Sequence, residues 1–221
     1  MERAGLLKFW DSSVGKKVVM GATGLILVAF VILHMAGNLQ FFVGAERFNA
    51  YSHLLQVDLI EVTWGMRIAL LVAVVLHITA AYQLTVRNRA ARPADYVKRE
   101  PQVSTYAART MRWGGVYLLL FIPYHLMHFT IGNLHPAFVR GQAYGNVVIG
   151  FESIWVGLFY LGAIAFLALH LYYGAWAMFR TLGIARPSND PLHRRLALAL
   201  AIVVPVGFSL LPLSVMLGLI R

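Results

Sequence analysis

The chain has 221 residues, of which 59% are hydrophobic, and its mean hydropathy of +0.68 is too high for an ordinary soluble domain. It contains no cysteine, which excludes disulfides, thiolate zinc sites, iron–sulfur ligation by this chain and thioether-attached haem. The net charge of +10 does not point to nucleic acid, because the basic residues lie between apolar runs, where they set membrane topology.

Five apolar segments are long enough to cross a bilayer, since about 20 residues of helix cover its ~30 Å of hydrocarbon. Helices are required because an open sheet would leave unpaired backbone groups in lipid. We therefore predict an all-α fold, a single membrane domain over residues 1–221, with a last span that is kinked by Pro205 and Pro212. The spans are expected at residues 18–43, 64–86, 114–131, 154–179 and 196–220. Residues 6–10 are expected to lie flat as an interfacial helix.

Lysine and arginine are unequally divided between the two sides of this arrangement. Fifteen fall on the side of the N-terminus and four on the other side. The positive-inside rule therefore predicts a cytoplasmic N-terminus and an external C-terminus for a multi-pass membrane protein.

Four of the five spans carry a histidine inside the apolar run, which is a costly place for two polar ring nitrogens. These histidines are His34, His77, His125 with His128, and His170. The remaining three are placed outside the spans: His53 and His193 in loops, and His135 at an outer end.

The intramembrane histidines fall at two depths. His34 and His128 lie 17 and 16 residues beyond the nearest cytoplasmic basic residue, whereas His77 and His170 each lie 10 residues before one. At about 1.5 Å of rise per residue these depths are roughly 25, 24, 15 and 15 Å. The spacing predicts an outer pair, His34 with His128, and an inner pair, His77 with His170, about 10 Å apart along the membrane normal.

Paired imidazoles on facing helices suit a flat macrocycle whose iron takes one imidazole on each face. A single intramembrane histidine fits a plain hydrogen bond to a neighbouring helix equally well, but four at two matched depths favour two haems. A zinc or copper site would instead gather its ligands at one depth. His125 competes with His128, because it lies one turn earlier on nearly the same face, and the depth match favours His128. Small residues are well placed for close helix approach at Gly21, Gly24, Gly37, Gly162 and Gly174.

These residues resemble the cytochrome b membrane anchor of succinate dehydrogenases and fumarate reductases (succinate:quinone oxidoreductase, respiratory complex II). The resemblance rests on SSVGKKVVMGATGLIL followed by HMAGNL, on YHLMHFTIG in the third span and on FLALHLYYGAW in the fourth. It covers nearly the whole chain and points to the branch with a single five-helix anchor and two haems b.

The resemblance implies a role in the respiratory chain and the tricarboxylic acid cycle, in a bacterial cytoplasmic membrane. The anchor would dock an iron–sulfur subunit, itself bound to a flavoprotein that carries the succinate chemistry, and pass electrons through both haems to menaquinone. It also implies that His77 and His170 hold the proximal haem, and that His34 and His128 hold the distal one. One departure is Ala168, where some fumarate reductases of the family carry a glutamate, so succinate oxidation is favoured over fumarate reduction.

Other residues are candidates to support these cofactors. Anionic haem propionates prefer cationic or donor partners near the membrane surface. The candidates are Lys17, Arg112, Trp113 and Arg180 on the inner side, and Arg67 and Arg140 on the outer side. For the distal quinone, which takes up protons, the candidates are Asp58 and Glu61, with His53 nearby. Each of these also fits a plain surface or helix-end role.

Two alternatives stay open. The cytochrome b subunit of a hydrogenase or formate dehydrogenase also uses intramembrane histidines, although the GKK and HMAGNL strings favour the succinate family. A transporter or scaffold without cofactor is the alternative from another class. The lack of Asp or Glu inside any span argues against a proton-coupled transporter.

Overall fold

The computed structural model describes residues 5–91, 106–186 and 188–221. It is 86% helix and has no strand among these residues, which confirms the predicted all-α fold. Five helical segments are long and apolar enough to cross a membrane, as predicted: Ser13–Val43, Ile60–Ala90, Tyr106–Ile131, Ile154–Thr181 and Asp190–Met216. Arg3, Arg92, Lys98 and Arg99, which contribute to the predicted charge asymmetry, lie outside the described residues.

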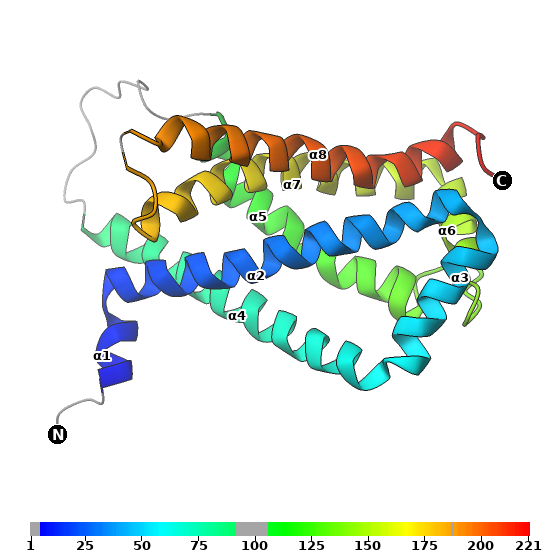
Figure 1. Cartoon of the computed structure of the whole chain (residues 1–221), viewed down its shortest axis with the longest axis horizontal. Helices are drawn as coiled ribbons and strands as arrows, with labels where there is room; N and C mark the ends of the chain where they lie inside the picture. The colour runs from blue at the N-terminus through cyan, green and yellow to red at the C-terminus, as the bar shows by residue number, and fades with distance from the viewer. Residues whose placement is uncertain (1–4, 92–105, 187) are drawn as a thin grey trace.

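The long helices alternate in direction along the bundle (Figure 1). They are α2 (Ser13–Leu39), α4 (Ile60–Ala90), α5 (Tyr106–His125), α7 (Ile154–Thr181) and α8 (Asp190–Met216). In the described chain α7 packs against α8, α5 and α2, whereas α4 packs mainly against α2. The helices α4 and α7 are thus brought near each other because both pack against α2, and they make little contact of their own.

The two ends of the bundle differ (Figure 1). One end carries the short helix α1 (Gly5–Asp11) and the connection from α7 to α8. The other carries α3 (Ala45–His53), α6 (Ala143–Glu152) and the C-terminus. An aromatic core that includes Phe41, Phe48 and Phe151 packs α3 and α6 onto the spans, so the second end is closed by protein.

The first end is shaped by a corner between α1 and α2. Ser12 caps α2, because its hydroxyl accepts a hydrogen bond of 2.8 Å from the Gly15 amide. Lys16 is 1% exposed, and its ammonium donates to the Trp10 carbonyl and lies 4.5 Å from the Trp10 ring centre. The buried ammonium of Lys16 is thus paired with a carbonyl and an aromatic ring of α1.

Several span boundaries differ from the predicted ones, and both ends of the last span do so for clear physical reasons. The last span begins at Asp190 and not at residue 196. Proline is favoured in the first turn of a helix, so Pro191 allows α8 to begin in the polar sequence that precedes the apolar run. It ends at Met216, before residue 220, since Gly218 adopts a left-handed conformation with φ of 69° and stops the helix. Pro205 and Pro212 both lie inside α8.

Short π-helical turns interrupt the chain at two places, η2 (Leu54–Asp58) and η3 (Leu126–Ile131), and a 3-10 turn, η1 (Gln40–Val43), follows α2. The turn η3 extends α5 just beyond Pro123, a residue that cannot donate a helical hydrogen bond. Such turns often occur at functional sites. His128 lies within η3, next to His125 at the end of α5.

Candidate cofactor site

His77 of α4 and His170 of α7, which we call the inner pair, face each other inside the bundle. Their ring centroids are 6.3 Å apart and their planes are inclined by 54°. Two imidazoles that bind one metal ion through facing nitrogens, each at about 2 Å, have ring centres roughly 6 Å apart. The structure therefore brings together the two rings that the depth match pairs, at a separation that suits shared ligation.

The ring of His77 is held in one tautomer. Its Nδ1 lies 3.0 Å from the Met20 carbonyl oxygen, which can only accept, so Nδ1 carries the proton and donates it. The Thr23 hydroxyl lies 3.3 Å from the same nitrogen. Nε2 is left with its lone pair, and a second nitrogen that donates to a backbone carbonyl is typical of metal-ligating histidines.

The His77 ring is packed closely against α2, whereas the His170 ring has a nitrogen without a hydrogen-bond partner in the described chain. A Cβ added at Gly24 of α2 would stand 3.3 Å from Cε1 of His77, so the missing side chain lets the ring lie against α2. Nδ1 of His170 is buried and has no hydrogen-bond partner in the described part of the chain. A buried polar atom without a partner costs roughly 1–3 kcal/mol, so the position is one where a ligand would be stabilising.

His34, His125, His128 and Tyr160 form a second group, which we call the outer cluster. The His34 ring lies 5.8 Å from that of His125, edge to face at 75°, and stacks on Phe30 at 5.3 Å. Its Nε2 lies 3.4 Å from the Asn38 side-chain nitrogen. Among the described histidines only His125 has a ring contact with His34, and Phe208 contacts the same ring at 5.7 Å.

The Tyr160 hydroxyl lies between two rings of this cluster, 3.0 Å from Nδ1 of His128 and 3.3 Å from Nδ1 of His125. It has a single proton and no other hydrogen-bond partner in the described chain. One ring must therefore accept that proton at Nδ1, while the other donates its own Nδ1 proton to the phenolic oxygen. The two histidines carry opposite tautomers, and only the donor has a lone pair on Nε2.

His128 is completely buried, and its Nε2 has no hydrogen-bond partner in the part of the chain that is described. Its ring stacks on that of His135 at 5.0 Å. His135 is satisfied on both sides: Nδ1 accepts from the Ala137 amide at 3.1 Å, and Nε2 donates to the Asn146 carbonyl at 2.8 Å. His135 therefore has a structural role, and sequence reasoning placed it at a span end without detecting its burial.

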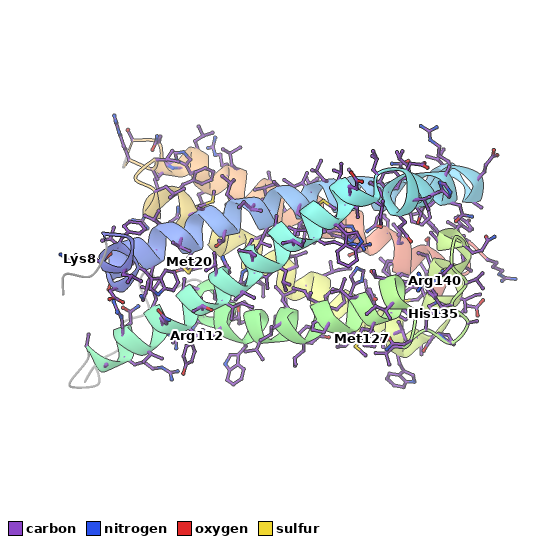
Figure 2. All side chains as sticks on the ribbon, turned by 90° about the horizontal axis from the view of Figure 1, so that it is seen from below. Lys8, Met20, Arg112, Met127, His135 and Arg140 are labelled. Carbon is purple, nitrogen blue, oxygen red and sulfur yellow. The ribbon has the colours of Figure 1, made fainter. Side chains whose placement is uncertain are left out.

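The two groups lie at different levels along the bundle. Figure 2 labels Met20, whose carbonyl binds His77, toward the end that carries Lys8 and Arg112. It labels Met127 and His135, which flank His128 in sequence and in space, toward the end that carries Arg140. The two groups therefore lie at different levels, with His77 nearer the end that carries Lys8 and His128 nearer the end that carries Arg140.

The residues predicted to contact haem propionates or quinone are exposed or contact a side chain near them in sequence. Lys17, Arg112, Trp113 and Glu61 are exposed, and so is Arg140. The guanidinium of Arg67 lies 5.1 Å from the Trp64 ring centre, and Arg180 lies 3.9 Å from Asp190. Asp58 lies 3.3 Å from Nδ1 of the exposed His53, which brings together two of the residues named for a distal quinone.

One histidine is placed differently from the sequence interpretation. His193 is not in a loop but in the first turn of α8, where it is 7% exposed and its ring lies 4.5 Å from that of Phe179. Its Nδ1 has no partner among the described residues. The sequence Asn189–Asp190–Pro191 is the signal that could have extended the helix to include it.

Residues 5–91, 106–186 and 188–221 contain no group of three or more His, Asp or Glu side chains that could hold a metal ion. Two imidazoles from different helices are the donor set that a six-coordinate haem iron takes from a protein, and His77 with His170, and His34 with His125, are such pairs of neighbouring rings. Comparison of the chain with protein-family models, with curated proteins and with solved structures finds no match.

Proposed function

We propose that this chain is the membrane-anchoring, haem-bearing subunit of a succinate:quinone oxidoreductase, which binds two haems b, one above the other. The observation that carries the proposal is the presence of two contacts between imidazole rings, at two levels of the bundle: His77 with His170 at 6.3 Å and His34 with His125 at 5.8 Å. Each contact joins two different membrane helices, as haem sites in helical bundles do. The resemblance of the histidine-bearing strings supplies the link to succinate.

The inner haem would be held by His77 and His170. The Met20 carbonyl keeps the proton of His77 on Nδ1, so that Nε2 is ready to ligate without rearrangement. Gly24 keeps α2 close enough for that hydrogen bond to form. When bound, haem iron supplies one-electron transfer, and the protein's part is to fix the two rings and exclude water from between the helices.

The outer haem would take His34 as one ligand, and two observations favour different rings for the other. The ring contact favours His125, whereas the unpartnered Nε2 favours His128, the residue that depth matching selects. The ring contact carries more weight, because two ligands of one iron have ring centres roughly 6 Å apart, and among the described residues His34 has such a contact with His125 and none with His128. We therefore propose His125 as the ligand, with its Nδ1 proton donated to Tyr160 and that of Tyr160 donated to His128.

The rest of the proposal concerns partners and direction. The excess of basic residues on the side of the N-terminus supports a cytoplasmic location for that end, where the iron–sulfur and flavoprotein subunits would dock. The contact between His53 and Asp58 supports a quinone site at the opposite end, because quinone reduction needs a proton donor near water. Ala168 supports succinate oxidation, with menaquinone as the acceptor.

Absorption spectroscopy on membranes that contain the protein tests this function. We expect a reduced-minus-oxidised haem b spectrum that develops when succinate is added and stays absent when formate or hydrogen is added. Reduction by formate or hydrogen alone would instead identify the subunit of a formate dehydrogenase or hydrogenase. A purified chain without haem absorbance would favour the transporter or scaffold.

A further inference from the structure

A groove lies between α7 and α8 at the end of the bundle where these helices connect. It has a volume of about 380 Å³, and its walls come from both helices. The lining residues are Tyr172, Asp190, Pro191, Arg194, Arg195 and Leu198. Two adjacent arginines therefore face a concave surface whose other walls are largely aromatic or apolar.

Arg194 is held in a fixed position in this groove. Its Nε donates to the Tyr172 hydroxyl at 2.9 Å, and its guanidinium lies 5.7 Å from the Trp176 ring centre. No hydrogen bond within the described part of the chain uses its terminal nitrogens. A guanidinium fixed through Nε presents these two nitrogens as a fork, which matches the oxygens of a phosphate.

Trp176 organises the basic residues around the groove. The guanidinium of Arg180 lies 5.1 Å from its ring centre, and that of Arg194 lies 5.7 Å from the same centre. Its indole nitrogen donates to Asp190 at 3.1 Å, and Arg180 lies 3.9 Å from the same carboxylate. The negative charge of Asp190 is thus partly compensated within the protein, while Arg194 and Arg195 remain positively charged beside the groove.

The groove is separate from the candidate cofactor site. Tyr172 follows His170 by two residues on α7, and at about 100° per residue the two side chains point roughly 200° apart around the helix. His170 points toward His77 inside the bundle, so Tyr172 points away from it. A ligand in the groove would contact the outer surface of α7 and α8.

We propose that this groove binds the phosphate of an anionic phospholipid, with Arg194 and Arg195 as its main contacts. Basic pockets between membrane helices near the interface recognise such headgroups, and Trp and Tyr are typical of the same level. A lipid is favoured over a soluble phosphate because Leu198, which is 49% exposed, continues the groove along the apolar surface of α8, where an acyl chain would lie. This site does not depend on whether the chain binds haem.

The test uses the full chain, with any subunits that copurify, in nanodiscs of phosphatidylcholine alone or mixed with phosphatidylglycerol. The double variant Arg194→Gln/Arg195→Gln is compared with Arg47→Gln/Arg221→Gln, which has the same net charge and alters exposed arginines at the opposite end. Bound lipid is counted by native mass spectrometry, and the thermal midpoint is recorded. We expect the wild type and the control to retain phosphatidylglycerol selectively, and the groove variant to lose roughly fivefold or more in affinity for it.

Milder variants keep the result interpretable if the double variant folds poorly. Tyr172→Phe removes only the hydroxyl that orients Arg194, and Arg194→Lys keeps the charge but not the fork, so both should weaken selective retention to a smaller extent. Equal loss in the groove and control variants would overturn the proposal, because the effect would then be one of net charge. Binding of glycerol phosphate as tight as that of the lipid, or loss of soluble subunits with unchanged lipid retention, would overturn it as well.

Discussion

The inner pair and the outer cluster use the same side chain in different settings. The inner pair has one ring on each of two helices, and a backbone carbonyl fixes the tautomer of His77. The outer cluster places two histidines one turn apart, and a single hydroxyl, that of Tyr160, contacts both. A carbonyl can only accept, whereas a hydroxyl can donate or accept, so the inner pair has one arrangement and the outer cluster has two.

The largest effect is expected at the inner pair. His77→Ala or His170→Ala should abolish binding of the inner haem, because no second histidine contacts either ring in the described chain. The outer haem should be largely retained, since its rings lie at another level. Haem quantification and a redox titration of each variant check this, and selective loss of the other haem would contradict the assignment of levels.

The choice between His125 and His128 sharpens the comparison. His125→Ala should remove the outer haem, because this ring lies opposite His34, whereas His128→Ala should retain most of it. Low-spin haem signals in electron paramagnetic resonance distinguish loss of a ligand from a change in its surroundings. The reverse result would show that the outer helices shift to bring His128 to the iron, as depth matching from the sequence predicts.

A smaller effect is expected from Tyr160→Phe, which removes the hydroxyl shared by the two rings while keeping the aromatic packing. Loss of such a supporting hydrogen bond typically weakens metal binding by roughly 10- to 100-fold. We expect weaker retention of the outer haem and a changed outer signal, with the inner signal unaltered. An unchanged outer signal would mean that Tyr160 does not select the tautomer.

The smallest effect is expected from Gly24→Ala. The added Cβ would stand 3.3 Å from the His77 ring, which must move by a few tenths of an ångström. Occupancy of the inner haem should fall only a few-fold, without loss of the fold. Gly65→Ala in α4 is the matched control, because a Cβ there meets nothing within 4 Å. Equal behaviour of the two variants would exclude a role for close contact at Gly24.

Much of the fold was predictable because each span has its own continuous apolar run, and five such segments are found. The inner pair was predictable because depth alone, counted from flanking charges, brings His77 and His170 to one level. The outer pair predicted by depth, His34 with His128, stays a prediction, since depth separates His125 from His128 by only one turn. His128 also lies in the π-helical turn after Pro123, which a regular helical count does not anticipate, whereas His125 is the last residue of α5.

The burial of His135 and His193, which the sequence places outside the spans, could not be predicted from the sequence either. His135 is buried because the chain folds back and its two nitrogens bond to backbone groups. His193 is buried because α8 begins in polar sequence, before its apolar run. In both cases the deciding contacts join residues that no periodic pattern relates.

Haem content per chain tests the central claim most directly. The pyridine haemochrome of the purified wild-type protein, divided by its chain concentration, should approach two haems b per chain. The inner-pair variants should approach one. A wild-type protein without haem, or inner-pair variants with the same haem content as the wild type, would contradict the account.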